Sequence, residues 1–519
     1  MQVTMEGISD FFAGRSVFIT GATGFMGKVL LEKLLRSCPS IDSIYILVRP
    51  KKGKDPSTRV EGLLECRLFD SLRKNQPGFE KKVLPVVGDI LEPALGISDD
   101  DLDTLCEKVS VVFHSAATVK FDEELKLSVL MNVDGTKKMI ELGKKMKKLD
   151  VFIHVSTAYC NCDREEITEC VYPPPVHPNK ILDACEWMSD DMINQLAPQM
   201  IVPRPNTYTY TKALAEYLIV ESSTDFPIAI VRPSIVGASW QEPFPGWVDN
   251  FNGPTGVLAA IGKGILRMMS GNYDGTADVI PVDIATNLMI SAAWYTAVER
   301  PSTMKIYNCT TGELNRITWG QIERASYEYM MKNPLDDIIR IPNPRFTSNR
   351  FWRTANMWMD HYFPAWLGDL YCRAMGRKAG LVRLQQKLWK SVGCLEYFTS
   401  HEWKFHVDNV EALNEKLSQE DRETYNFDVR KIHWPTYLEN YCFGVKRYAL
   451  NEDLSNMPKA RKQVERLQKR NKMMSLILYA YLLRFLARRV AVIGNVYYFV
   501  ISVILRLLKS IPLPAAISW

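Results

Sequence analysis

The sequence predicts an α/β fold: a doubly wound parallel sheet, a mostly helical C-terminal domain and a C-terminal membrane anchor. Short β-branched runs alternate with amphipathic stretches from Val17 to about Pro281, which is typical of successive βαβ units. From about residue 355 to 450 the alternation is lost and aromatic residues are frequent, and residues 458–519 are basic and apolar. We therefore expect three parts, at residues 12–330, 355–450 and 458–519.

A glycine-lined turn follows the first expected strand. The run Thr20–Gly27 lies between the apolar Val17–Ile19 and the helical pattern of Lys28–Leu35. Glycine permits a tight turn and a close approach of a phosphate, and the amides at a helix N-terminus attract an anion. The spacing is Gly-x-x-Gly-x-x-Gly rather than Gly-x-Gly-x-x-Gly. The sequence thus predicts a Rossmann dinucleotide site formed by Thr20, Gly21, Thr23, Gly24, Phe25, Met26 and Gly27.

The other elements of the sheet follow in order. Further strands are expected at Ser43–Val48, Val83–Val87, Val111–His114, Val151–Val155 and Pro227–Val231. Helices are expected at Lys28–Arg36, Ser57–Leu72, Glu124–Lys145 and Tyr210–Ser222. This order is that of a doubly wound sheet, in which ligands bind at the carboxyl ends of the strands.

Basic residues follow the second strand. Arg49 comes directly after it, and Lys51 lies two residues further on. In this fold that strand end faces the adenosine ribose, where a basic side chain accommodates the 2′-phosphate of NADP. Arg49 and Lys51 therefore favour NADPH. The alternative is an ordinary solvated basic loop.

Two further strand ends carry candidate cofactor contacts. Asp89 and Ile90 follow the third strand, where a carboxylate can accept a hydrogen bond from the adenine amino group. The small residues Ser115, Ala116 and Ala117 follow the fourth, where the cofactor can lie against the backbone. Alternatively, Asp89 caps a turn and the neighbouring His114 is a hydrogen-bonded core histidine.

The reactive groups are expected at the end of the fifth strand and on the helix that follows. Ser156 and Thr157 end the strand, and Tyr208 and Lys212 are four residues apart, so they share one helix face. A nearby ammonium would lower the pKa of the tyrosine toward working pH. A hydroxyl of Thr157 or Ser156 would hold a substrate carbonyl beside the phenol. The pattern predicts carbonyl reduction by hydride from a nicotinamide.

This ordered set resembles the extended short-chain dehydrogenase/reductase family over residues 14 to about 320. The likeness includes Asn132–Thr136, Val231–Ser234 and Ile280–Asp283. It implies that Tyr208 is the acid/base, Lys212 its pKa partner and a ribose ligand, and Thr157 rather than Ser156 the family's hydroxyl. It also implies cofactor contacts at Pro233 and Ile235.

Further stretches look like fatty acyl-CoA reductases of the vertebrate type. They include His154–Tyr159, Tyr172–Val176, Arg204–Tyr208, Arg232–Gly253, Leu395–Phe398 and Phe427–Arg430. The resemblance implies reduction of a long-chain acyl-CoA to a primary fatty alcohol by two NADPH, with release of CoA, for ether-lipid or wax synthesis. Alternatives are another membrane-bound oxidoreductase of the extended family, such as a sterol dehydrogenase, and a scaffold that senses NADPH without turnover.

Charge and cysteine content restrict the remaining classes. The net charge is +5, but residues 458–519 hold twelve Lys or Arg and one Glu, so the body is mildly acidic. This argues against nucleic acid and for an anionic membrane surface. The eleven cysteines lack paired spacing, which fits a reducing compartment. The group Cys160, Cys162, Cys170 and His177 matches no metal-ligand pattern, and we expect no metal.

The tail is expected to attach the chain to a membrane. Uncharged stretches at 473–483 and 490–505 are interrupted by arginines, and neither reaches the ~20 residues of a spanning helix. A tilted span, a shallow hairpin and an interfacial anchor remain open. Without an N-terminal signal peptide, the catalytic part is expected to face the cytosol. The resemblance favours the peroxisomal membrane, with the endoplasmic reticulum as the alternative. The aromatic residues of 355–450 predict either a core or an acyl-chain cleft.

Overall fold

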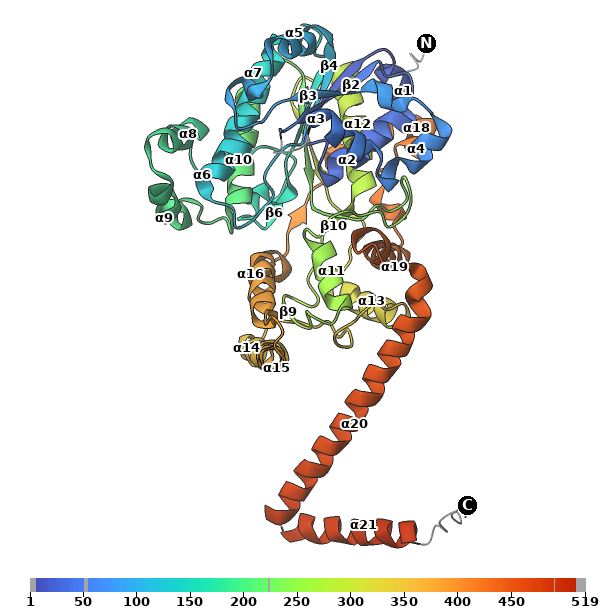
Figure 1. The fold of residues 1–519 in the computed structure, drawn as a ribbon. Helices are drawn as coiled ribbons and strands as arrows, with labels where there is room; N and C mark the ends of the chain where they lie inside the picture. The colour runs from blue at the N-terminus through green and yellow to red at the C-terminus, as the bar shows by residue number, and fades with distance from the viewer. Residues whose placement is uncertain (1–5, 51–54, 223–224, 490, 510–519) are drawn as a thin grey trace.

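A seven-stranded parallel sheet forms the centre of the molecule (Figure 1). The computed structural model describes residues 1–519 except 1–5, 51–54, 223–224, 490 and 510–519. The strand order is β11-β7-β5-β4-β1-β2-β3. The strands are β1 (Ser16–Thr20), β2 (Ser43–Val48), β3 (Val83–Val87), β4 (Val109–His114), β5 (Val151–Val155), β7 (Ile228–Pro233) and β11 (Lys305–Cys309).

Helices cover both faces of this sheet (Figure 1). Side chains alternate along β1, so Val17 and Ile19 join one buried cluster while Phe18 joins the other. The first cluster includes α1 (Ile8–Phe12), α2 (Phe25–Ser37), α3 (Pro56–Leu64) and α12 (Val282–Glu299). The second includes α5 (Asp99–Lys108), α6 (Leu125–Val129), α7 (Gly135–Lys145), α8 (Pro178–Trp187), α9 (Asp190–Met200) and α10 (Thr207–Glu221). The doubly wound prediction is confirmed.

The strand order reverses between β1 and β4, which is where ligands bind in such sheets. All six expected strands form, and β11 is an additional one. The helix expected at Ser57–Leu72 is broken, because Cys66 has an extended backbone; it becomes α3, the 3-10 turn η1 (Arg67–Phe69) and α4 (Asp70–Asn75). The helix expected at Glu124–Lys145 forms as α6, the π-helical η4 (Leu130–Asp134) and α7.

The C-terminal half is mostly helical, and most of it lies below the sheet in Figure 1, while residues 408–424 pack beside the sheet. Its helices are α11 (Pro254–Gly262), α13 (Trp319–Lys332), α14 (Arg350–Asn356), η6 (Met357–Tyr362), α15 (Phe363–Ala374), α16 (Leu381–Ser400), α17 (Asp408–Lys416), α18 (Gln419–Thr424), α19 (Trp434–Gly444) and η8 (Val445–Ala449). Short strand pairs connect it to the rest: β8 (Ile235–Gly237) with β10 (Val279–Pro281), β9 (Met269–Ser270) with β12 (Phe346–Thr347), and β6 (Glu166–Ile167) with β13 (Lys404–Phe405).

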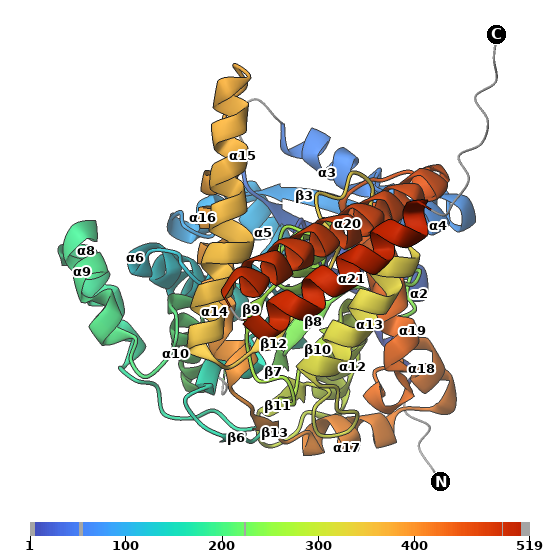
Figure 2. The ribbon, with the colours of Figure 1, turned by 90° about the horizontal axis from the view of Figure 1, so that it is seen from below.

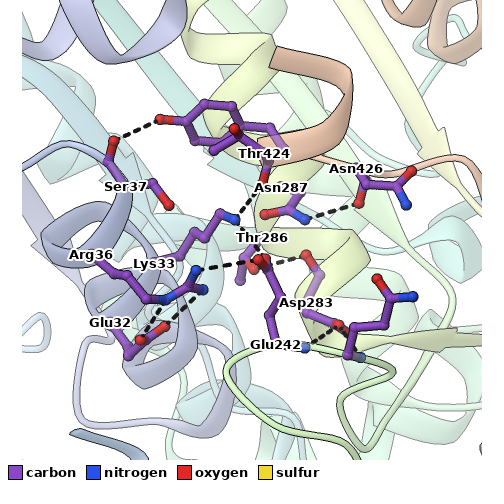
Figure 3. Close-up of polar contacts among 12 residues, drawn as sticks. Glu32, Lys33, Arg36, Ser37, Glu242, Asp283, Thr286, Asn287, Thr424 and Asn426 are labelled. Carbon is purple, nitrogen blue, oxygen red and sulfur yellow. Dashed lines mark hydrogen bonds and ion pairs between the residues drawn. The ribbon is translucent and has the colours of Figure 1, made fainter. Parts of the chain in front are cut away.

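A buried polar network ties α2 to segments far along the chain (Figure 3). The Lys33 ammonium is 1% exposed and donates to the carboxylate of Glu242, at 2.5 Å, and to the Thr424 carbonyl. Arg36 donates to Glu242 at 3.2 Å. The buried Asp283 carboxylate holds the same loop, because it accepts the backbone N–H groups of residues 240–242 at 2.8–3.0 Å. Each buried charge therefore has a partner, as burial requires.

Two long helices follow, and beyond the first turns of the earlier one, which pack on the body, they project away from it (Figure 1). They are α20 (Met457–Arg489) and α21 (Ala491–Lys509). The second half of α20 exposes apolar side chains, including Leu476, Leu478 and Tyr481. Among the described residues, no helix combines the length and the apolar character that a membrane crossing requires.

Candidate active site

The glycine turn after β1 requires its glycines. Gly21 has φ +78°, and a Cβ there would lie 2.8 Å from the Ala116 nitrogen at the end of β4. A Cβ on Gly27 would lie 2.2 Å from the Gly21 carbonyl oxygen. The Gly24 amide closes the turn by donating to that same carbonyl at 2.9 Å. The spacing of these glycines thus follows from the close packing of α2, β1 and β4.

The start of α2 can hold an anion. Gly24 is the N-cap residue, and within the described chain no side chain caps this helix, so the first amides, at Phe25 and Met26, are free for a ligand. Thr20 lies beneath the turn, where its hydroxyl pairs with His114 Nδ1 at 2.8 Å and accepts the Ala116 amide at 3.2 Å. Thr23 is half-buried beside it. The turn fits the pyrophosphate of a dinucleotide.

The other predicted cofactor contacts line the same edge of the sheet. Arg49 is exposed after β2, while Lys51 lies outside the described residues. Asp89 is half-buried and accepts the Leu91 amide at 3.2 Å, so it does cap a turn. Ile90 is buried against Gly135. The residues after β4 are half-buried: Ser115, Ala116 and Ala117.

Hydroxyl groups meet at the end of β5. The side chain of Thr157 hydrogen-bonds the Tyr208 phenol. Thr157 Oγ1 also donates to the Pro233 carbonyl at 3.4 Å, which places the end of β7 beside it. The neighbouring Ser156 is buried, and its hydroxyl has no hydrogen-bond partner in the part of the chain that the structure describes. Ile235 follows in β8, partly exposed. The structure thus brings Thr157, Tyr208 and Pro233 together.

Lys212 lies on α10 with Tyr208, as the spacing predicted, but its ammonium is held elsewhere. Lys212 Nζ donates to the Val155 carbonyl at 2.7 Å, and burial lowers the pKa of Lys212 to about 8. Lys212 is not among the groups that shift the pKa of Tyr208 in this structure, and the expected coupling of the two residues stays a prediction. Desolvation raises the pKa of Tyr208 well above its ordinary value, and the Thr157 hydrogen bond offsets only part of that rise. The phenol is therefore protonated at neutral pH.

Two neighbouring residues of the site could not be assigned from the sequence. Phe121 stacks on the Tyr208 ring, with centroids 5.9 Å apart, and on Phe398 of α16, at 5.2 Å. The side-chain amide of Asn132 donates to the Thr211 hydroxyl at 2.9 Å and to the Thr118 carbonyl at 3.2 Å, which joins the loop after β4 to α10. Asn132 belongs to a quoted motif, whereas nothing in the sequence relates Phe121 to a helix 277 positions away.

A buried ion pair fixes α10 against the sheet. Arg232 of β7 and Glu216 of α10 are both at most 1% exposed, and their charged groups are 2.7 Å apart. The Cys160 thiol donates to the same carboxylate at 3.3 Å, and burial raises the pKa of Cys160 strongly. A thiolate is therefore disfavoured at this position. Among the described residues, no cluster of His, Cys, Asp or Glu could hold a metal ion.

The glycine turn, the open start of α2 and the hydroxyl pair at β5 define a nicotinamide-dependent oxidoreductase of the extended short-chain type. The male sterility protein family matches in two blocks, at residues 19–289 and 360–452. Fatty acyl-CoA reductase 1 from Xenopus laevis is 47% identical over 97% of this chain and 98% of its own length. The Homo sapiens protein of that name is 45% identical over the same shares. Fatty acyl-CoA reductase 2 from Mus musculus is 43% identical, over 96% and 97%. The chain belongs to the fatty acyl-CoA reductase family.

Solved structures share the fold at low identity. The reductase domain of a nonribosomal peptide synthetase from Mycobacterium tuberculosis has a TM-score of 0.55 and 18% identity, over 83% of this chain and 91% of that one. The terminal reductase domain of the myxalamid pathway has a TM-score of 0.52 and 18% identity, over 83% and 90%. The sheet with its helical C-terminal region is therefore a known reductase architecture.

Proposed function

We propose that this protein reduces long-chain acyl-CoA to a primary alcohol with NADPH and releases CoA. The observation that carries the proposal is the Thr157–Tyr208 hydroxyl pair beside the anion-binding turn, in a chain 47% identical along nearly its whole length to a protein named fatty acyl-CoA reductase 1. The alcohol would supply ether-lipid or wax synthesis.

The site residues have distinct tasks in this chemistry. The bound nicotinamide supplies hydride. Thr157 and the protonated phenol of Tyr208 donate hydrogen bonds to the thioester carbonyl oxygen and stabilise the negative charge that develops there. Collapse of the tetrahedral adduct expels the CoA thiolate and leaves an aldehyde. A second NADPH would supply the hydride that the aldehyde carbon needs, and Tyr208 would give its proton to the oxygen. Lys212, whose ammonium donates to the Val155 carbonyl, would bind the ribose hydroxyls.

The stoichiometry of the reaction tests this function. Purified protein is supplied with NADPH and palmitoyl- or stearoyl-CoA, and NADPH consumed is measured against CoA released. Two NADPH per CoA is the expected result, and one per CoA would limit the product to the aldehyde. No consumption would overturn the proposal.

The preference for NADPH over NADH rests on Arg49, which is exposed directly after β2. We expect Arg49→Glu to lower the ratio of kcat/KM for NADPH to that for NADH by about 10–100-fold, because a charge-assisted contact with the 2′-phosphate is lost and repulsion is added. Lys108→Glu is the matched control, since it changes the net charge equally at the end of α5 and should leave the ratio unchanged. An unchanged ratio in Arg49→Glu would remove Arg49 from this role.

The tail supports a membrane location for the enzyme. Basic residues fill the first half of α20, and exposed apolar residues fill the second. Such a segment binds an anionic surface and inserts its apolar part. The peroxisomal membrane is our first choice and the endoplasmic reticulum the second, with the catalytic part in the cytosol. Colocalisation of the full chain with organelle markers tests the organelle. A chain truncated after Ser455 that pellets with membranes as fully as the intact chain would contradict the anchor.

A further inference from the structure

The segment formed by α14, η6 and α15 presents apolar side chains to the outside. Met359 is 73% exposed and Trp358 60%. The same segment also carries Trp352, Phe363, Trp366 and Tyr371, each more than half exposed. A surface helix normally buries its apolar face, and a large exposed apolar patch on a protein marks an interaction site. We call these six residues the α15 surface. Other aromatic residues of 355–450, such as Phe398 and Phe405, do lie in a buried core as expected, whereas these six do not.

Polar contacts on the opposite face fix this orientation. The carboxylate of Asp369 is buried and accepts the amides of Gly380, Leu381 and Val382 at 2.7–3.1 Å, so it caps the start of α16. His361 is eight positions earlier on the same helical face, and it packs edge-on against Trp389 of α16 at 5.2 Å. Rolling α15 to bury its apolar face would break the cap. The exposed face is therefore built into the fold.

The segment around the α15 surface carries an excess of positive charge, although Arg353 pairs with Glu396 and Lys390 with Asp122. Residues 350–390 contain eight lysines and arginines but two acidic residues, Asp360 and Asp369. Asp369 is committed to its helix cap, and Asp360 lies 3.4 Å from Arg267. Arg373, Arg377 and Lys378 are exposed at and beyond the end of α15. Tryptophan and tyrosine with flanking basic residues are the composition of a segment that lies in the interface of an anionic bilayer.

The α15 surface lies on the side of the body from which the tail projects (Figure 1). Viewed from that end, α14, α15, α20 and α21 all lie in front of the sheet domain (Figure 2). The basic first part of α20, residues 457–472, spans about 24 Å before the first exposed apolar residues. The helices α14 and α15 and the tail thus lie on the same side of the body.

We propose that the α15 surface inserts into the interface of an anionic phospholipid bilayer, as a second attachment besides the tail. This inference rests on the membrane location proposed above. The chemistry of the side chains identifies the bilayer as the binding partner. The aromatic rings would lie at the level of the headgroups, and the basic side chains would contact lipid phosphates and carboxylates. It also orients the enzyme, because α16 then runs from the bilayer, at Leu381, to Phe398 beside the active site.

Tryptophan quenching in the full chain tests the inference. The protein is bound to vesicles of dibrominated phosphatidylcholine with 30% phosphatidylserine, and the quenched fraction of its fluorescence is measured. The variant Trp352→Phe/Trp358→Phe/Trp366→Phe removes three of the twelve tryptophans. We expect its quenched fraction to fall at least threefold while flotation with the vesicles is unchanged. Trp187→Phe is the matched control, since Trp187 is 71% exposed on α8, away from this side, and should quench as the wild type does.

Other outcomes contradict the inference in distinguishable ways. A triple variant that floats and is quenched like the wild type would show that only the tail meets lipid. A wild-type chain that does not float would overturn the membrane location as well. A wild-type dimer that the triple variant converts to a monomer without vesicles would assign the surface to a second copy instead. Equal quenching on vesicles without phosphatidylserine would show that anionic lipid is not needed for insertion of the α15 surface. NADPH turnover in detergent, expected unchanged, shows that each variant is folded.

Discussion

The glycine turn and the α15 surface differ in what surrounds them. At the turn, a single added Cβ would meet backbone atoms, so neighbouring segments determine each residue. At the α15 surface, large side chains have little protein around them, and only the inner, polar face of the helix is determined. In the ligand-binding turn, close packing restricts which residue fits at each position. On a docking face, the outward side chains lack such packing within the chain and are free to contact another surface.

The largest expected effect concerns the chemistry at the packed site. We expect Tyr208→Phe to lower turnover of acyl-CoA by about 10²–10⁴-fold, because the proton donor is lost, while the Kd for NADPH changes less than about twofold. Steady-state kinetics measures the turnover, and a fluorescence titration measures the Kd for NADPH. Tyr210→Phe is the control, since Tyr210 is buried in the core one helix face away and should keep its turnover. Turnover in Tyr208→Phe at the wild-type rate would exclude the proposed role.

A second prediction concerns the pH dependence that burial gives to Lys212. Its pKa is about 8 in the fold against 10.5 in the unfolded chain, so the unfolded chain binds more protons between these values. The free energy of unfolding should therefore rise with pH through this window, by about 3 kcal/mol relative to Lys212→Met, whereas below pH 8 the destabilising effect of the buried ammonium is complete and independent of pH. Urea denaturation of both proteins at pH 7 and pH 10 measures it. If the free energies of unfolding of the two proteins change with pH in parallel, the Lys212 ammonium is exposed to solvent and the prediction is wrong.

The glycine turn itself can be tested by adding one carbon atom. Gly27→Ala should weaken NADPH binding by about 10–100-fold, because the new Cβ would displace the Gly21 carbonyl and the start of α2. Gly62→Ala in α3 is the matched control: it has open space around it and should gain up to about 1 kcal/mol of stability. Equal NADPH affinities in the two variants would show that the turn is looser than its contacts indicate.

The smallest effect is expected at the α15 surface. Trp366→Ser should change the free energy of unfolding in detergent by less than about 0.5 kcal/mol, because the ring has few contacts to lose. Trp294→Ser should cost about 3–5 kcal/mol, since Trp294 is 1% exposed and donates to the Glu6 carbonyl at 2.9 Å. If Trp366→Ser lowers the free energy of unfolding by more than about 2 kcal/mol, other parts of the chain cover this surface. The contrast between the α15 surface and the packed site would then be wrong.

Much of the sheet and its turn could be predicted because both have local causes. Residue alternation marked the strands, and glycines at fixed spacing marked the start of α2. Helical spacing correctly placed Tyr208 and Lys212 on one helix. It could not show that the Val155 carbonyl holds the lysine, because that contact joins positions 57 apart. The roles of Tyr208, Arg49 and Asp89 stay predictions.

Other features could not be predicted because their causes are distant in sequence. Phe121 meets Tyr208 only through folding, and its second partner, Phe398, comes from the helical half. The aromatic run after residue 350 has the composition of a core, and only the cap between Asp369 and α16 turns it outward. Contacts of this kind have no periodic pattern.

The network around Lys33 has a consequence for biosynthesis. The buried ammonium has a partner at Thr424, 391 residues later, in a segment that packs on α2. A ribosome adds about 5–20 residues per second, so this partner emerges about 20–80 s after Lys33. Until then the lysine lacks one of its hydrogen-bond acceptors, and the dinucleotide-binding half is incomplete on the nascent chain. Chaperones have this interval in which to act before the first helix of the cofactor site reaches its final packing.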